Sequence, residues 1–332
     1  MVADNRSYHF IQTVTLQGQL VDPGMLLEAT YIETMDLSGP KLILVYRDPF
    51  KVIRDDQRLA EESILTVEMG DFNQLDRAQI KSEFRVGSID EEGDRITVNC
   101  THRTISELKR PAPQARLYAA RTPAYILRDL VPEMVIDADP VPVLGDHHLH
   151  AGESRTLFLQ RMAREHGAVV WGCRGALHFK KVAGLLSPLV PRFELVYEHG
   201  NRLAPYQLRS YRNLPGERSY KEAFDRKLQG WSMTGGPVLS RKHTDAPIRL
   251  HSHHNASALD GLTARLVPYI EADSHGNAEI APGVIIPTVF HRDDAVSVVD
   301  ESLPVELLVG LVAHHQDESG YRCLIEGWRP VA

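Results

Sequence analysis

The first 110 residues are divided into short apolar runs by turn-forming residues, and this pattern restricts them to β-strands. The run Met25–Leu37 ends at Ser38-Gly39-Pro40, and a second run, Lys41–Tyr46, follows directly. Two apolar runs joined by a glycine-proline break predict a β-hairpin. Three further runs have the same character: Ile64–Met69, Phe84–Ile89 and Arg95–Cys100. We therefore expect a first all-β domain, a barrel or a sandwich.

The next part of the chain carries helix signals. The pair Thr122-Pro123 is a hydroxyl N-cap followed by proline at the first helical position, and this helix should end near Leu130. A second helix is expected over Ser154–His166, where apolar residues recur every three or four positions. Gly167 follows at the position of a left-handed terminator. A tight hairpin around Gly172-Cys173-Arg174-Gly175 completes a small α+β unit.

From Phe193 onward, β-forming segments return. A helix is expected over Ala258–Tyr269, with Asp260-Gly261 weakening its first turn. The strands are expected at Phe193–Tyr197, Pro205–Tyr211, Val284–Phe290, Val305–His314 and Tyr321–Trp328. The order β, α+β, β predicts a mainly β chain with a smaller α+β middle unit. We expect three domains, at residues 1–110, 111–191 and 192–332.

The composition excludes several classes of protein. Of the 332 residues, 43% are hydrophobic and 24% are charged, values typical of a folded globular protein. The longest apolar stretch, Val182–Pro191, is much shorter than the roughly 18 residues of a membrane span, so no membrane-spanning segment is expected. The polar start, Met1–Arg6, is not followed by the apolar core of a signal peptide. A net charge of −7 argues against wrapping DNA or RNA, because phosphate binding needs a basic surface.

Three widely spaced cysteines, Cys100, Cys173 and Cys323, make a disulfide framework unexpected and favour a reducing compartment. Cys100 and Cys323 lie at or within expected strands and should be buried, whereas Cys173 should be exposed in its turn. None has a histidine partner fixed by sequence, and no Gly-x-Ser-x-Gly motif is present. No catalytic nucleophile is therefore predicted.

Two histidine clusters are candidates for a metal site: Asp146-His147-His148-Leu149-His150 and His251-Ser252-His253-His254. On a strand, His148 and His150 would share one face, and His251 would share a face with His253. Closely spaced imidazoles can bind zinc or iron. The spacing fixes no third or fourth ligand, however, and the helical two-histidine pattern is missing. We therefore favour polar loop histidines without a metal or other cofactor, and keep a histidine-site metalloenzyme as an alternative.

The remaining charged or glycine-rich motifs are interpreted as surface. Gly235-Gly236 is followed by neither a lysine nor a helix pattern, which argues against a nucleotide loop. Of His314-His315, one residue should pack in the core and the other should be solvated. The acidic pairs Asp55-Asp56, Glu61-Glu62, Glu91-Glu92 and Asp293-Asp294 lie in charged loops or at element edges. We assign no catalytic, cofactor-binding or metal residue and expect that the chain is not an enzyme.

The segment 152–179, which reads GESRTLFLQRMAREHGAVVWGCRGALHF, carries a specific resemblance. It resembles the baseplate hub family of contractile phage tails, which is related to the front part of the type VI secretion spike protein. Two outer segments, Ile64–Asp71 and Gly310–Trp328, are similar to an early strand and to the closing hairpin of such hubs. Within the segment, the matching positions are Glu153-Ser154, Phe158–Ala163, Gly167–Trp171, Gly175 and Leu177–Phe179.

The resemblance implies two tube-like β-barrel domains flanking the helix-containing domain. It implies a homotrimeric ring of pseudo-sixfold symmetry in the tail baseplate of a virion, assembled in the host cytoplasm. Its implied partners are the tail spike protein, the tail tube or tube-initiator protein and other baseplate (wedge) proteins, with DNA only in transit during ejection. The family has no catalytic residues to carry over. A type VI secretion-like spike component is the closest alternative.

Overall fold

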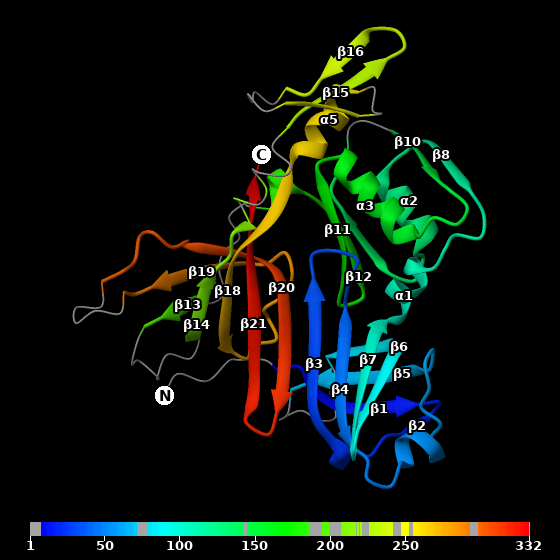
Figure 1. The fold of residues 1–332 in the computed structure, drawn as a ribbon, viewed down its shortest axis with the longest axis vertical. Coiled ribbons are helices and arrows are strands. Elements are labelled where there is room, and N and C mark those ends of the chain that lie inside the picture. Colours follow the sequence, from blue (N-terminus) through cyan, green and yellow to red (C-terminus); the bar gives the residue numbers. More distant parts are fainter. Residues whose placement is uncertain are drawn as a thin grey trace.

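The chain is mainly β, as predicted, and its helices gather beyond one end of a large sheet (Figure 1). Among the described residues, no helix combines the length and the apolar character that a membrane span requires. The computed structural model describes residues 8–71, 79–141, 145–185, 194–198, 207–216, 218, 220, 226–241, 247–251, 255–292 and 298–331.

The amino-terminal strands are antiparallel and form one part of a 13-stranded sheet. The five strands predicted here are all present as β3 to β7. Their inward side chains, including Val67, Phe84 and Val98, are fully buried in one apolar cluster. The elements are β1 (Phe10–Leu16), β2 (Gln19–Leu20), a 3-10 turn (Pro23–Met25), β3 (Leu26–Thr34), β4 (Lys41–Arg47), a π-type turn (Val52–Asp56), β5 (Ile64–Gly70), β6 (Ile80–Glu92) and β7 (Arg95–His102).

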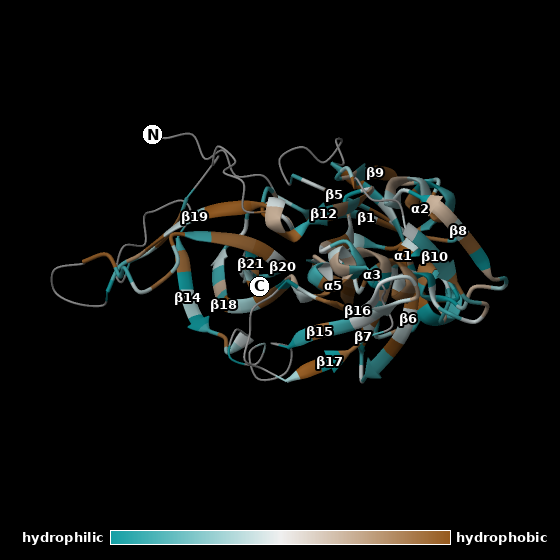
Figure 2. Cartoon of the chain, turned by 90° about the horizontal axis from the view of Figure 1, so that it is seen from above, coloured by the Kyte–Doolittle hydropathy of each residue, from teal (hydrophilic) through white to brown (hydrophobic). Residues whose placement is uncertain are grey.

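The carboxy-terminal strands continue the same sheet around a second apolar cluster. Each of the five segments predicted as strands contains one, although Phe193 and Pro205 lie outside the described residues. Seen from above, β19 is largely hydrophobic (Figure 2). The strands are β13 (Leu195–Tyr197), β14 (Leu208–Asn213), β18 (Arg265–His275), β19 (Ile285–Phe290), β20 (Glu306–Asp317) and β21 (Gly320–Val331).

The prediction of a helix over Ala258–Tyr269 is wrong in its second half. Helix α5 (Ala256–Thr263) ends early, and β18 begins at Arg265. Along β18, Ile270 and alternate residues after it are buried, which is the period of a strand. Antiparallel pairing with β21 along the whole length of β18 satisfies its backbone, whereas Pro268 would disrupt a helix interior.

Strands β3 and β20 join the two parts of the sheet. They pair antiparallel from Thr34↔Leu311 to Ala29↔Gln316 and lie side by side in Figure 1. The order of strands is similar on both sides of this pair. Hairpin β3–β4 extends the sheet one way, and hairpin β20–β21 extends it the other way. Each part of the chain therefore contributes the first strand of a hairpin to the junction.

The middle region packs helices against small sheets around a third apolar cluster. Both predicted helices are confirmed, with their caps: the Thr122 hydroxyl accepts from the Tyr125 N–H at 3.3 Å, and the Ser154 hydroxyl accepts from the Leu157 N–H at 3.2 Å. The elements are α1 (Arg103–Lys109), which was not predicted, β8 (Arg116–Arg121), α2 (Pro123–Leu130), β9 (Val135–Ala138), β10 (Gly145–Leu149), α3 (Arg155–Glu165), β11 (Ala168–Cys173), β12 (Ala176–Lys181) and a 3-10 turn (Val182–Gly184). The division into domains at residues 110 and 191 stays a prediction.

A small separate sheet projects above the helices (Figure 1). It consists of β15 (Lys227–Ser232), β16 (Gly236–Leu239) and β17 (Ile248–Leu250). The register places Leu228 and Arg249 on the inner face of this sheet. Its outer face exposes the large apolar side chains of Trp231, Leu239, Ile248 and Leu250.

Adjacent positions on α3 provide a test of the middle core. Phe158 is 1% exposed, whereas Leu157 is 61% exposed. Phe158→Asp should lower the free energy of unfolding by more than about 4 kcal/mol, because it removes a buried ring and buries an unpaired charge. Leu157→Asp is the matched control and should cost less than about 1 kcal/mol. Chemical denaturation of both variants measures this difference, and equal losses would contradict the assigned helix face.

Candidate functional site

Glu33 on β3 is the most unusual side chain in the described structure, because it is an acid with no exposed surface. Arg174, in the β11–β12 turn, donates from Nη2 to Glu33 Oε2 at 3.0 Å, and its Nε lies 3.3 Å from both carboxylate oxygens. Tyr31 Oη and Cys173 Sγ each donate to Oε1 at 3.0 Å. Burial alone would raise the pKa of Glu33, but Arg174 and His314 together outweigh it and hold this pKa far below its usual range.

The same carboxylate faces the carboxy-terminal strands. His314 Nε2 on β20 lies 3.6 Å from Glu33 Oε2. The other ring nitrogen of His314 lies 2.7 Å from Tyr321 Oη and 3.3 Å from Cys323 Sγ, both on β21. Burial acts to lower the pKa of His314, but its contacts with Cys323 and Glu33 raise it to about 9. Glu33 therefore connects β3, the middle hairpin and the last two strands.

The prediction that Cys173 is exposed is wrong. The hairpin turn consists only of Arg174-Gly175, and Cys173 ends β11 in register with Ala176, at 5% exposure. Burial, followed by the negative charge of Glu33, raises the pKa of the Cys173 thiol well above its usual value. Burial also raises the pKa of Cys100 to about 12. Cys100 and Cys323 are buried as predicted.

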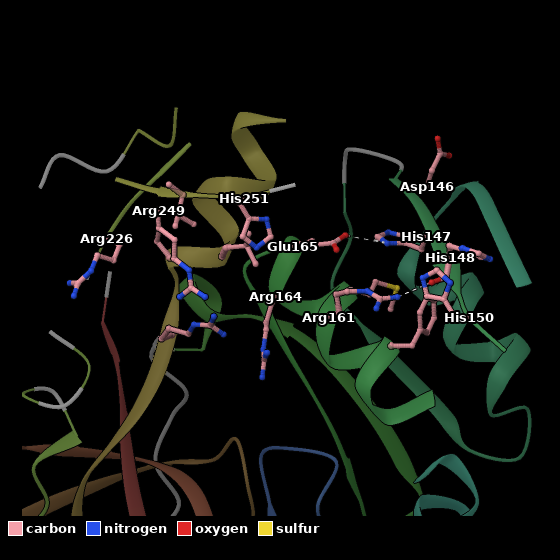
Figure 3. A pocket seen from close by; sticks show the side chains of 16 residues that line it. Asp146, His147, His148, His150, Arg161, Arg164, Glu165, Arg226, Arg249 and His251 are labelled. Carbon is pink, nitrogen blue, oxygen red and sulfur yellow. Dashed lines mark hydrogen bonds and ion pairs between the residues drawn. The ribbon is translucent and has the colours of Figure 1, made fainter. Parts of the chain in front are cut away.

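The histidine clusters meet in one cavity of about 610 Å³ between α3, α5, β10 and β17 (Figure 3). His147, His148 and His150 line one side, and His251 lines the other. As predicted, His148 and His150 lie on the same side, with ring centroids 4.2 Å apart; both are exposed, and His150 directly follows the end of β10 at Leu149. His253 and His254 lie outside the described residues.

His147 is the buried member of its cluster. Its Nδ1 lies 3.3 Å from Glu165 Oε2, and its Nε2 lies 3.3 Å from His166 Nε2. Across the described ranges, no three His, Cys, Asp or Glu side chains are arranged to hold a metal ion. The cavity therefore gives the metalloenzyme alternative no ligand set among these residues.

Of the two strand-end histidines, His314 is buried in the core as predicted. The prediction that the other is solvated is wrong, because the His315 side chain is only 18% exposed and its ring nitrogens are bonded to Thr30 and Asp317. Asp293-Asp294 lies outside the described residues. The pairs Asp55-Asp56, Glu61-Glu62 and Glu91-Glu92 are exposed.

The Glu33–Arg174 pair was missed, although the sequence contains a signal for Glu33. Ala29, Tyr31 and Glu33 alternate along β3, so the apolar pattern places Glu33 on the inward face. A carboxylate at an inward position requires a partner. The sequence does not identify that partner, because Arg174 lies 141 residues further along the chain.

Removing the charge of Glu33 should destabilise the fold. Glu33→Gln leaves the Arg174 guanidinium, whose side chain is 28% exposed, without its counter-ion. We expect a loss of about 1–2 kcal/mol in the free energy of unfolding, less than for a fully buried pair, because water partly solvates the guanidinium. Glu28→Gln on the same strand is the control: Glu28 pairs with Arg95 at 2.7 Å, but both side chains are at least 40% exposed. This change should cost less than about 0.5 kcal/mol. Urea denaturation compares the two, and a smaller effect of Glu33→Gln would contradict a structural role for the pair.

His166 should make stability depend on pH. Burial, followed by the charge of His147, lowers the pKa of His166 from 6.5 to about 4. The unfolded chain therefore binds a proton below pH 6.5 that the folded chain takes up only near pH 4, and stability falls as pH decreases through this window. Because the ring is only half-buried, we expect His166→Gln to remove about 1–2 kcal/mol of this fall. Thermal unfolding from pH 7 to 4 measures it, with exposed His150→Gln as the control. A profile parallel to that of the unmodified protein would refute the assignment.

Comparison with known proteins gives no sequence relative but a clear similarity of fold. No protein-family model matches the chain, and no curated protein matches it. The tail protein of Neisseria meningitidis MC58 aligns at a TM-score of 0.65 with 10% identity, over 98% of this chain and 96% of that one. The 43 kDa tail protein of prophage MuSo2 from Shewanella oneidensis aligns at 0.64 with 11% identity, over 98% of both chains.

A third similar structure comes from a secretion machine. It is a component of the E. coli type VI secretion system, described as structurally similar to the T4 bacteriophage tail proteins gp27 and gp5. The alignment has a TM-score of 0.54 and 9% identity, and covers 96% of this chain and 77% of that one. The resemblance predicted from segment 152–179 is thus confirmed for the fold, and the chain has the fold of phage tail proteins and of a type VI secretion component.

Proposed function

We propose that the chain is the structural hub of a phage-type tail baseplate. In this role it forms a homotrimeric ring that joins the central spike to the tail tube and lets DNA pass on ejection. The observation that carries the proposal is the alignment of 98% of the chain with the Neisseria tail protein at a TM-score of 0.65. Because the alignment covers 96% of that protein as well, the proposal concerns the whole chain rather than one module.

The arrangement of the large sheet supports two similar units per chain. Hairpins β3–β4 and β20–β21 flank the β3–β20 pair in the same order. We propose that residues 1–110 and 192–332 form two tube-like barrels, with residues 111–191 as the domain between them. Three chains would then present six similar units, which reconciles a threefold spike with a sixfold tube.

The outer face of the β15–β17 sheet supports contact with another protein. Trp231 is 62% exposed and Leu250 is 77% exposed, and both lie on one face of this sheet, which also carries Lys227 and Gln229 of the central strand. Several large apolar side chains exposed on one face are typical of interaction sites. Partners in this proposal are the spike protein, the tube or tube-initiator protein and other baseplate (wedge) proteins in the virion.

A type VI secretion-like spike component is the second candidate, favoured by the alignment with the E. coli secretion protein over 96% of this chain. Both candidates are structural, and neither requires a catalytic residue. They differ in cargo, because a phage hub passes DNA and a secretion spike does not. Packaging of DNA into particles that contain the chain would therefore distinguish them.

Native mass spectrometry tests the ring. We expect the protein to give a metal-free assembly of three 37.3 kDa chains, alone or when co-expressed with candidate spike and tube proteins. Trp231→Glu with Leu250→Glu should reduce incorporation into that assembly by about tenfold, because charges replace buried apolar contacts. Leu117→Glu, at an exposed position on β8, is the control and should assemble normally. A monomer in every combination, or a monomer holding one zinc ion, would overturn the proposal.

A further inference from the structure

The cavity shown in Figure 3 is strongly basic, although the chain as a whole is acidic. Its described lining contains two carboxylates, Asp146 and Glu165. The lining arginines are Arg161, Arg164, Arg226, Arg249 and Arg265. In a chain with a net charge of −7, this is a local excess of positive charge within a concave surface.

Three of these arginines are not neutralised by any described acid. Arg161 is held by the Glu153 carboxylate at 2.5 Å, and the Glu165 carboxylate is occupied by His147. In contrast, Arg164, Arg249 and Arg265 have no ion pair with a described residue.

Arg265 also lies close enough to Arg164 and Arg249 to be repelled by both. Burial, followed by the charges of Arg164 and then Arg249, lowers the pKa of Arg265. A bound anion would reduce this repulsion and would supply the negative charge that no described acid provides to these arginines.

A second cavity, of about 630 Å³, shares two of the arginines. Arg164 and Arg265 line both cavities. The rest of the second cavity is largely apolar and includes Leu214, Pro215, Leu266, Val267 and Pro268. A ligand placed across the two guanidinium groups would therefore meet positive charge on one side and an apolar surface on the other.

Close backbone contact holds the walls of the basic cavity together. Gly261 in α5 packs on the end of α3, where an added Cβ would lie 2.6 Å from the Glu165 carbonyl oxygen and 3.0 Å from that of Arg164. Glycine costs about 1 kcal/mol relative to alanine inside a helix, but here it permits this approach. The arginines of α3 and β18 are thus brought together by packing rather than by a mobile loop.

We propose that these two cavities bind an acidic peptide segment of another protein, with carboxylates on Arg164, Arg249 and Arg265 and adjacent apolar side chains in the second cavity. Guanidinium groups form two parallel hydrogen bonds with carboxylates. The apolar cavity favours a peptide over a nucleic acid, whose backbone offers no apolar group at this spacing.

Fluorescence anisotropy with the full chain tests the proposal. The probe is a fluorescein-labelled peptide of four alternating Asp and Glu residues followed by Leu-Leu-Phe. We expect micromolar binding that weakens as salt increases. Arg164→Gln with Arg249→Gln should weaken it by about tenfold. Arg128→Gln, an exposed arginine on α2 without an ion pair to a described residue, is the matched control and should change it by less than about twofold.

Three outcomes would overturn the proposal. They are no binding of the acidic peptide, equal binding of a peptide in which serine replaces the acids, and equal or tighter binding of a ten-nucleotide oligothymidine. Circular dichroism verifies that the double variant is folded, and Arg249→Gln alone provides a second variant, because Arg249 lies on the small β17 strand. The measurement needs no ring, so its failure is distinguishable from failure of the hub proposal.

Discussion

The ion pair of buried Glu33 and partly exposed Arg174 is the contact on which the arrangement of the chain depends. It joins β3 to the β11–β12 turn, and Arg174 Nη2 also donates to the Ile280 carbonyl at 2.9 Å in the carboxy-terminal part. Cys173, whose thiol donates to Glu33, belongs to an apolar cluster with residues from all three parts, including Met35, Trp171 and Leu308. A buried carboxylate tolerates little displacement from its partners, because any shift leaves its charge without a counter-ion.

The β3–β20 pair also connects the amino-terminal and carboxy-terminal parts of the chain, through backbone hydrogen bonds. At Gly310 the pairing of β20 with β21 shifts register, and the Met35 N–H donates to the Gly310 carbonyl at 2.7 Å. The Trp328 ring lies directly over Gly310, where an added Cβ would be only 2.0 Å from a ring atom. Glycine is required at this bulge for steric reasons, since a side chain would displace the ring that covers the end of the junction.

Local signals in the sequence predicted the local structure well. Thr122 and Ser154 cap their helices as expected, and the alternating runs of the first 110 residues are strands. Contacts between distant residues were not predictable in this way. The pairing of β18 with β21, the burial of Cys173 and the meeting of His150 with His251 in one cavity each depend on segments that lie several tens of residues apart or more. Such contacts follow from tertiary packing, which overrides local propensity.

A polar contact between two parts of a chain fixes their relative position more strictly than an apolar contact of the same size. Apolar surfaces gain similar free energy in several relative positions, because the hydrophobic effect has no direction. The Glu33 carboxylate, in contrast, satisfies Arg174, Tyr31 and Cys173 in one geometry. We infer that this network fixes the angle between the two parts of the sheet rather than adding net stability. In the ring of three copies that we propose, small errors in that angle would add around the axis, and a fixed angle would allow the ring to close.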